Sequence, residues 1–395
     1  MRKIVGITGI RSDYDLMSPL YRYLAQDPEV DLRLIVGGAH MSRTYGRTVD
    51  FIRSDGIEIL ATIESLIDGD EPSSRAKSAA VLFQSAIDAV ANWSPDLLIY
   101  PGDREEVLIG ALLGTYLEIP TVHFYGGDHT RTGHVDNPVR HATSKLSTAH
   151  FVSMPEHKAR LVAMGEDERR IFVTGSIALD NFVSEPAVDF NSLKQRLKLA
   201  IENGHYALVI FHPDPSERAA AARILTNILD VLAEAETLAC VGYPNTDPSN
   251  KELIQVIESC KMRPNVFVYR SLVRSDFLAL YRNAKFIIGN SSSGITEAAS
   301  IPLPAINVGI RQRGRAASSN VIFCDSDRTA IRSAISSACR PEFLDEVKVA
   351  GNPYGDGHSA QRAAALLASV DFQSLRLKTE DPLDAPYARH IDKQA

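Results

Sequence analysis

The sequence predicts an α/β protein of two Rossmann-like, doubly wound domains with a central cleft, and two observations lead to this prediction. Short apolar runs alternate with longer amphipathic stretches, which is typical of βαβ units that build a parallel sheet buried on both faces. This alternation starts again in the second half of the chain, after a stretch with Gly, Asn and Pro near residues 175–185. The length of 395 residues is enough for two separate cores.

The expected strands are apolar runs that end in short turns, most of them rich in Gly or Pro. In the first half they cover residues 3–8, 32–36, 96–100 and 121–125, and in the second half residues 207–211, 238–241, 266–269 and 286–288. The amphipathic stretches predict helices over residues 16–26, 76–92, 105–116, 217–235 and 275–282. We therefore expect domains over residues 1–178 and 179–370, a polar tail over residues 371–395, and a last helix near residues 359–367 that packs back on the first domain.

Composition and charge exclude several classes of protein. Hydrophobic residues make up 45% and charged residues 23% of the chain, as in ordinary globular proteins, and the net charge of −7 comes without a long basic run. We therefore expect no nucleic-acid partner. No stretch is long enough for a membrane helix, and the first apolar run is too short for a secretion signal. The four cysteines form neither a CxxC pair nor a zinc spacing, so we expect reduced thiols. Together these features predict a cytoplasmic location and no membrane contact.

Ligands of doubly wound sheets bind beyond the carboxyl ends of the strands, which directs attention to the polar residues there. The turn GIRSDY, residues 9–14, places Arg11 where a helix begins and where a cation can meet an anionic ligand. Ser12 or Asp13 would cap that helix. The pattern is not GxGxxG, so no dinucleotide cofactor is predicted.

The segment PGDREE, residues 101–106, sets Asp103 and Arg104 after a fully apolar strand and before a helix. An N-cap position explains the aspartate by itself, and we favour that interpretation when the segment is considered alone. The functional alternative is a carboxylate at the floor of the cleft that acts as an acid or a base, with Arg104 lowering its pKa or holding substrate.

The longest polar block after a strand covers residues 123–141 and contains four of the eleven histidines. A zinc site is one interpretation, with candidate ligands His123, Asp128, His129 and His134. Their spacing matches no common metal motif, so we expect no metal. General acid–base chemistry by Asp128, His134 or Asp136 is the interpretation we favour.

In the second half, His212 ends the first strand at the expected cleft, where a functional group and a satisfied interface histidine are equally good interpretations. The segment GNSSSGITEA, residues 289–298, leads from a strand into a helix. Its backbone amides and hydroxyls suit a diphosphate, and they come from Ser291, Ser292 and Gly294.

Two further groups complete this phosphate-binding pattern. Glu297 would either cap the helix or accept hydrogen bonds from ribose hydroxyls. The run VGIRQRGR, residues 308–315, adds three arginines at another strand end, among them Arg311 and Arg315. A serine-rich turn beside a basic surface loop is the alternative for either segment alone.

Taken together, these motifs resemble the UDP-N-acetylglucosamine 2-epimerases, and most closely the hydrolysing branch that feeds sialic-acid-type sugar synthesis. The most specific pieces are RHATSKLS, residues 140–147, and GNSSSG, residues 289–294, and the resemblance is collinear from about residue 3 to about residue 320. It implies a glycosyltransferase-B-like architecture with a UDP-sugar in the cleft and neither metal nor nicotinamide. Hydrolysing members eliminate UDP from UDP-N-acetylglucosamine and hydrate the glycal to N-acetylmannosamine, whereas the others keep UDP and invert carbon 2.

The resemblance also implies roles for single residues. Arg11 matches a contact to the diphosphate, Asp103 and Asp136 match catalytic acids, and His212 matches a residue near the leaving phosphate. Many members have a glutamate where this chain has Tyr125, and Asp128 is our candidate for the missing base because a phenol is protonated at neutral pH. The expected catalytic residues are Asp103, Asp128, Asp136 and His212, and the expected substrate-binding residues are Arg11, Arg104, Tyr125, Arg140, Ser291, Ser292, Gly294, Glu297, Arg311 and Arg315.

Three alternatives to this function stay open on the sequence. In the first, the substrate is a 2,4-diacetamido-6-deoxy sugar on UDP or another nucleotide, which the changed loop at Tyr125 would suit. In the second, the protein is a glycosyltransferase of the same architecture. In the third, it is a non-catalytic sensor of nucleotide sugars. The number of acids in the expected cleft argues against a sensor, because buried carboxylates without a role are costly. We also expect a homo-oligomer, either a dimer or a tetramer.

Overall fold

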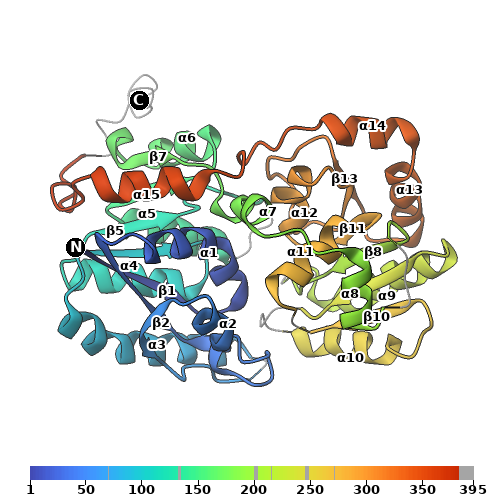
Figure 1. Cartoon of the computed structure of the whole chain (residues 1–395), viewed down its shortest axis with the longest axis horizontal. Helices are drawn as coiled ribbons and strands as arrows, with labels where there is room; N and C mark the ends of the chain where they lie inside the picture. Colours follow the sequence, from blue (N-terminus) through green and yellow to red (C-terminus); the bar gives the residue numbers. More distant parts are fainter. Residues whose placement is uncertain are drawn as a thin grey trace, which may run out of the picture.

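The computed structural model describes residues 1–69, 71–131, 135–199, 203–214, 216–244, 249–270 and 272–381. Within these residues two parallel sheets, each flanked by helices, form the two halves of the molecule (Figure 1). The chain passes from the first half to the second after β7 and returns to the first half before α15 (Figure 1). None of the described helices is long and apolar enough to cross a membrane.

The first sheet has seven described strands in the order β3-β2-β1-β4-β5-β6-β7, and every pair is parallel. Helices cover both faces, and β4 is therefore buried at all five positions. The strands are β1 (Arg2–Thr8), β2 (Val30–Val36), β3 (Glu58–Thr62), β4 (Leu97–Pro101), β5 (Thr121–Phe124), β6 (Ala149–Val152) and β7 (Ile171–Val173). The helices are α1 (Arg11–Ala25), α2 (Val49–Ser54), α3 (Pro72–Trp93), α4 (Glu105–Tyr116), α5 (Asp136–Leu146) and α6 (Pro155–Ala163).

The second sheet has six described strands in the order β10-β9-β8-β11-β12-β13, again all parallel. Its strands are β8 (Tyr206–Ile210), β9 (Leu238–Gly242), β10 (Val266–Tyr269), β11 (Phe286–Gly289), β12 (Ala305–Val308) and β13 (Val321–Cys324). Its helices are α8 (Phe190–Leu197), α9 (Ala221–Glu234), α10 (Asn250–Cys260), α11 (Arg274–Arg282), α12 (Ser293–Thr296), α13 (Arg328–Ala338) and α14 (Pro341–Val349).

Helix α15 (Ser359–Ser369) lies on the first half although it follows the second in the sequence (Figure 1). Its Ala363 and Leu367 belong to the same buried apolar cluster as the inner face of α1. The carboxylate of Asp180, in the crossing helix α7 (Asp180–Ser184), accepts hydrogen bonds from the first two amides of α15, at 2.9 and 2.7 Å. The expected return of the last helix to the first half is confirmed, and the exact domain boundaries stay a prediction.

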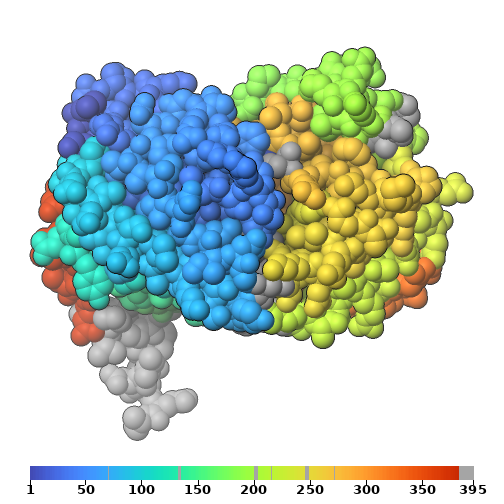
Figure 2. Space-filling model, turned by 90° about the horizontal axis from the view of Figure 1, so that it is seen from below, coloured from blue at the N-terminus to red at the C-terminus, as the bar shows by residue number. Residues whose placement is uncertain are grey.

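The strand order reverses once in each sheet, between β1 and β4 and between β8 and β11. Such a reversal opens a crevice at the carboxyl ends of the two strands, where ligands of these folds bind. On the face shown in Figure 2 the two halves touch along a seam. At this seam the amide of Arg131, after β5, donates to the carbonyl oxygen of Arg313, after β12, at 3.2 Å. The carboxyl ends of the two sheets therefore face each other.

Candidate active site

Asp103 follows β4 at the reversal point of the first sheet. Helix α4 has Arg104 as its N-cap residue, without a side-chain cap, so the capping interpretation of Asp103 is wrong. The Asp103 carboxylate instead accepts a hydrogen bond from Nη2 of Arg140, whose Nη1 donates to the carbonyl oxygen of Tyr125 at 2.8 Å. Burial raises the pKa of Asp103, and the Arg140 charge offsets part of this rise.

Asp128 lies where the two halves meet, and its carboxylate is almost fully buried. Nη2 of Arg315, from the second half, is 2.8 Å from its Oδ2, while Arg140 Nη1 is 3.9 Å from the same oxygen. His157 Nε2 lies 3.6 Å from the other oxygen. Burial alone would raise the pKa of Asp128, but the charges of Arg315 and Arg140 lower it to about 2. Asp128 is therefore ionised at neutral pH.

Asp136 occupies the first turn of α5, where the helix dipole favours a negative charge. Its Oδ1 lies 3.7 Å from Nη2 of Arg75, which also binds Glu105 at 2.6 Å. The charges of Asp136 and Asp128 both raise the pKa of Asp103, so the three carboxylates belong to one electrostatic cluster. The remaining acid–base candidate, His134, lies outside the described residues.

Tyr125 has a left-handed backbone, with φ of 64°, and its side chain packs against the apolar core around α1. Its hydroxyl donates to the carbonyl oxygen of Leu16 at 2.9 Å and accepts from the amide of Ala178 at 3.2 Å. Burial raises the pKa of the Tyr125 hydroxyl above its usual value. The Tyr125 hydroxyl therefore stays protonated at neutral pH, and both of these hydrogen bonds are to backbone groups of the protein.

The histidines of the 123–141 block do not form a metal site among the described residues. Nε2 of His123 donates to the carbonyl oxygen of Gly102 at 2.8 Å, and its Nδ1 accepts from the Ser144 hydroxyl at 3.0 Å. Burial lowers the pKa of His123 to about 3, so it is a neutral residue that fixes the turn before Asp103. No described group of three His, Cys, Asp or Glu side chains could hold a metal ion.

At the reversal point of the second sheet, Asn290 holds the backbone of His212. The Asn290 side chain accepts from the His212 amide at 2.7 Å and donates to its carbonyl oxygen at 2.8 Å. The carbonyl oxygen of Asn290 in turn accepts from Arg311 Nη1 at 3.0 Å and from Gln312 Nε2 at 3.1 Å. Asn290 thus connects three of the strand ends in which the sequence predicts phosphate-binding residues.

The serine-rich segment leads into α12, which has only four residues. A helix this short has a weak dipole, so the backbone amides and hydroxyls carry the anion-binding argument. The Ser291 hydroxyl accepts from the amide of Ser293, and the Ser293 hydroxyl donates to Glu297. Burial raises the pKa of Glu297 to about 7. Ser292 is the N-cap residue of α12, and Gly294 lies beside Ser291 in the wall of a small cavity.

Arg11 begins α1, and the N-cap residue of this helix is Ile10, so the expected cap by Ser12 or Asp13 is wrong. Nε of Arg11 lies 3.1 Å from Asp15, and its guanidinium stands over the ring of Phe51. These contacts hold the Arg11 guanidinium close to the start of its helix.

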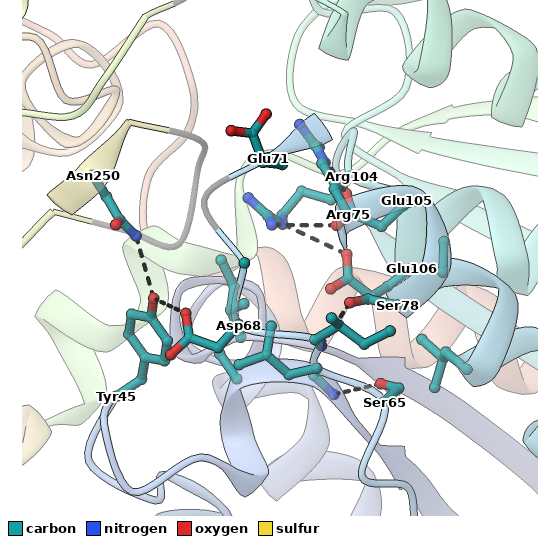
Figure 3. A pocket seen from close by; sticks show the side chains of 18 of the residues that line it. Tyr45, Ser65, Asp68, Glu71, Arg75, Ser78, Arg104, Glu105, Glu106 and Asn250 are labelled. Carbon is teal, nitrogen blue, oxygen red and sulfur yellow. Dashed lines mark hydrogen bonds and ion pairs between the residues drawn. The ribbon is translucent and has the colours of Figure 1, made fainter. Parts of the chain in front are cut away.

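A cavity that is open to solvent lies at the carboxyl ends of β1, β2 and β3, and Glu105 and Glu106 contribute to its wall (Figure 3). Arg75 and Arg104 point into it, and Nε of Arg75 donates to Glu105 at 2.7 Å (Figure 3). Asn250 of α10 reaches it from the second half and donates to the Tyr45 hydroxyl at 3.3 Å (Figure 3). Arg75 therefore connects this cavity with the acid cluster through Asp136.

Comparison with known proteins decides the family. The sequence profile of the UDP-N-acetylglucosamine 2-epimerases matches residues 22–368. This chain belongs to the UDP-N-acetylglucosamine 2-epimerase family. An epimerase of Legionella pneumophila, UDP-N,N'-diacetylbacillosamine 2-epimerase (hydrolyzing), is 34% identical over 376 residues, which are 95% of this chain and 97% of that protein. The UDP-N-acetylglucosamine 2-epimerase of Neisseria meningitidis is 33% identical over 340 residues, 86% of this chain and 88% of that protein.

A solved structure shows the same fold. A crystal structure of UDP-GlcNAc 2-epimerase from Neisseria meningitidis bound to UDP-GlcNAc superposes with a TM-score of 0.79 at 18% identity, and the match covers 93% of this chain and 100% of that one. The predicted glycosyltransferase-B-like fold of two Rossmann-like domains is thereby confirmed.

Three buried residues of this candidate site were not predicted from the sequence. Asn290 and Gln312 lie inside two of the predicted phosphate-binding motifs. No feature of the sequence indicates that the side-chain amides of these two residues form hydrogen bonds with backbone groups of neighbouring strand ends. His157, in the first turns of α6, faces Asp128 from a part of the chain without any motif. Only the folded chain brings these three side chains to the cleft.

Proposed function

We propose that this epimerase is hydrolysing: it eliminates UDP from UDP-N-acetylglucosamine and adds water to the glycal to give N-acetylmannosamine. The observation that carries the proposal is the cluster of Asp103, Asp128 and Asp136, in which neighbouring carboxylates have opposite pKa shifts. Pairs of titratable groups whose surroundings push their pKa values apart supply the acid and the base of a reaction.

The opposite shifts suggest a division of roles. Asp128 is ionised and would take the proton from carbon 2 of the sugar, because a base must be deprotonated before it acts. Asp103, whose pKa is raised, would return a proton to carbon 2 from the other face, and this inverts the centre. Asp136 would share this second role from the start of α5. Tyr125 would support Asp103 indirectly, since its carbonyl oxygen orients Arg140.

The second half would stabilise the leaving nucleotide. Departure of UDP places negative charge on a phosphate oxygen, which cations and backbone donors oriented in advance can stabilise. Near the reversal point of the second sheet lie two arginines and two serines, namely Arg311, Arg315, Ser291 and Ser292. Asn290 holds the backbone of His212 at the same point through a hydrogen bond. Arg11 would add a cation from the first half, and Glu297 would hold the ribose.

A second candidate keeps the reaction and changes the sugar to a 2,4-diacetamido-6-deoxy sugar on UDP. The similarity to the Legionella pneumophila enzyme, which spans nearly the whole chain, favours it. So does Tyr125, whose side chain packs on α1 where many members carry a glutamate.

Product analysis separates these candidates. Purified protein is incubated with UDP-N-acetylglucosamine, and separately with the UDP-linked 2,4-diacetamido-6-deoxy sugar, while NMR follows the nucleotide and the sugar. Release of UDP with N-acetylmannosamine supports the first proposal, and release from the second sugar alone supports the alternative. A sugar that stays on UDP with an inverted carbon 2 contradicts the hydrolysing assignment. The cytoplasmic location and the dimer or tetramer stay predictions from the sequence.

A further inference from the structure

We propose that Asp128 and the nucleotide diphosphate compete for Arg315, so that nucleotide binding frees the base of the reaction. This inference rests on the proposed function, and it adds a step that couples the two halves of the cleft. It concerns the order of events: Asp128 takes its full basic strength only after the nucleotide has drawn Arg315 toward the phosphates.

The geometry of Arg315 places it between two anion sites. Its Nη2 lies 2.8 Å from Oδ2 of Asp128, and both side chains are about nine-tenths buried, with exposures of 9% and 11%. Its Nη1 donates to the side chain of Gln312 at 2.9 Å. Gln312 is bound to the carbonyl oxygen of Asn290, the residue directly before Ser291. Nη2 of Arg315 thus contacts Asp128, the proposed base. Nη1 is linked through Gln312 to Asn290, next to the proposed phosphate site.

The other neighbours of Asp128 cannot replace Arg315. Arg140 is 3.9 Å away and already binds Asp103 and the carbonyl oxygen of Tyr125. His157 is buried, which lowers its pKa to about 4 and leaves it uncharged at neutral pH. Since charge interactions weaken with distance, Arg315 contributes the closest full charge to Asp128 among the described residues.

The competition has a chemical consequence. A carboxylate held this tightly by a guanidinium is a poor base for a carbon-bound proton. A diphosphate carries more negative charge than one carboxylate, so it is the stronger competitor for the guanidinium of Arg315. The base would then act only when a nucleotide occupies the cleft.

A double-mutant cycle on UDP affinity tests the competition without turnover. UDP is titrated by calorimetry at pH 7.5 into the wild type, Asp128→Asn, Arg315→Gln and the double variant. We expect Asp128→Asn to bind UDP about tenfold more tightly and Arg315→Gln to bind it at least about tenfold more weakly. In the Arg315→Gln background, Asp128→Asn should give no further gain, because the contested cation is gone.

A matched control distinguishes competition from plain charge repulsion. Glu105 provides this control: burial alone would raise its pKa, but the charges of Arg104 and Arg75 lower it, so the carboxylate is ionised. Glu105→Gln removes that charge, but its partner is Arg75, so its UDP affinity should stay unchanged. A tighter Glu105→Gln, or a gain from Asp128→Asn that persists without Arg315, would overturn the proposal, as would an unchanged or weaker Asp128→Asn. Thermal melting shows whether each variant is folded, and Asp128→Ser replaces Asp128→Asn if that variant does not fold.

The proposed function and this inference fail in different assays. If the cycle shows the expected coupling while no UDP-sugar is converted, the competition stands and the epimerase assignment falls. If sugars are converted and the coupling is absent, the reverse holds. A wild-type protein that does not bind UDP would overturn this inference.

Discussion

At the scale of single residues, position and surroundings shift the pKa values of chemically identical carboxylates in opposite directions. Asp103 and Asp128 both follow strands of the same sheet, yet the pKa of one is raised by burial and that of the other is lowered by two arginines. The sequence could place both residues at strand ends, because Gly and Pro mark those ends. It could not supply their partners, because Arg140 and Arg315 come from segments 37 and 187 residues away (140 − 103 and 315 − 128).

The first prediction concerns the acids. Asp103→Asn and Asp136→Asn should each reduce turnover by about 100- to 10,000-fold, because each removes an acid–base group. UDP affinity should stay nearly the same, since neither residue belongs to the proposed phosphate site. Steady-state kinetics and UDP calorimetry measure the two effects.

Tyr125→Phe serves as the control for that series. It removes one hydroxyl that Leu16 and Ala178 engage, so it should lower the free energy of unfolding by about 1 kcal/mol and leave most of the turnover. If Tyr125→Phe abolishes turnover while Asp128→Asn does not, a tyrosine acid or base has replaced the family glutamate and our assignment of Asp128 fails.

The second prediction concerns His40, which is fully buried between Thr8 and Thr48 with hydrogen bonds of 2.9 and 2.7 Å. Burial lowers its pKa to about 3, whereas the unfolded value is about 6.5. Between these pH values the unfolded chain binds the extra proton, so the stability present above pH about 6.5 is lost as the pH falls toward about 3.

Urea unfolding at pH 7 and pH 5 tests this sign. The free energy of unfolding of the wild type should fall by about 2 kcal/mol more than that of His40→Gln over this interval. The exposed His358 provides the control, and His358→Gln should follow the wild type. Equal losses in wild type and His40→Gln would show that His40 is not held neutral by the fold.

At the scale of elements, the sequence predicted the central strands well and the outer ones poorly. The expected runs at residues 3–8 and 96–100 match β1 and β4 to within one residue at each end. The strands β3, β6, β7 and β13 were not expected. These strands have three to five residues, and three of them lie at sheet edges, where partial burial weakens the apolar pattern.

Helix starts were the other weakness. Helix α1 begins at Arg11, five residues before the expected start, because its first turn carries Ser12 and Asp13 instead of apolar residues. Asp13 is nevertheless buried there, beside the cleft. Polar residues at the start of a helix that faces a ligand site conceal the apolar period on which the prediction depends.

The third prediction concerns the serine-rich segment. Ser291→Ala and Ser292→Ala should each weaken UDP binding by about tenfold or more, because a hydrogen bond to a charged group is worth about 1.5–3 kcal/mol. Calorimetry with UDP measures the loss. Ser369→Ala is the control and should leave UDP affinity unchanged, since its hydroxyl donates to the carbonyl oxygen of Ala365 within α15, on the first half. Unchanged UDP affinity in both Ser291→Ala and Ser292→Ala would remove this segment from the phosphate site.

At the scale of the whole molecule, a second cluster of charges joins the two halves and is separate from the cluster of Asp103, Asp128 and Asp136. Arg274, at the start of α11, lies 3.1 Å from Asp15, 3.2 Å from Asp55 and 3.3 Å from Glu185, and only 13% of its side chain is exposed. Asp15 also pairs with Arg11. The cluster therefore connects the second half with the helix that carries a predicted phosphate ligand.

The fourth prediction tests this connection. Arg274→Gln removes the cation that contacts all three carboxylates, while Arg11 still pairs with Asp15, and Arg22 with Asp55 and Glu185. It should therefore lower the free energy of unfolding by about 2 kcal/mol. Arg313→Gln is the control, because its partner Asp325 is exposed and such pairs contribute less than about 1 kcal/mol. Denaturant unfolding compares the two variants, and equal small losses would mean that the Arg274 cluster does not hold the halves together.

The central claim is that the cleft removes a proton from carbon 2 of a UDP-sugar and releases the nucleotide. The most direct test is the reaction with UDP-N-acetylglucosamine in deuterium oxide, followed by proton and phosphorus NMR. We expect free UDP to accumulate together with N-acetylmannosamine that carries one deuterium at carbon 2. A free sugar with its original hydrogen at carbon 2, or a deuterated sugar still attached to UDP, would contradict it.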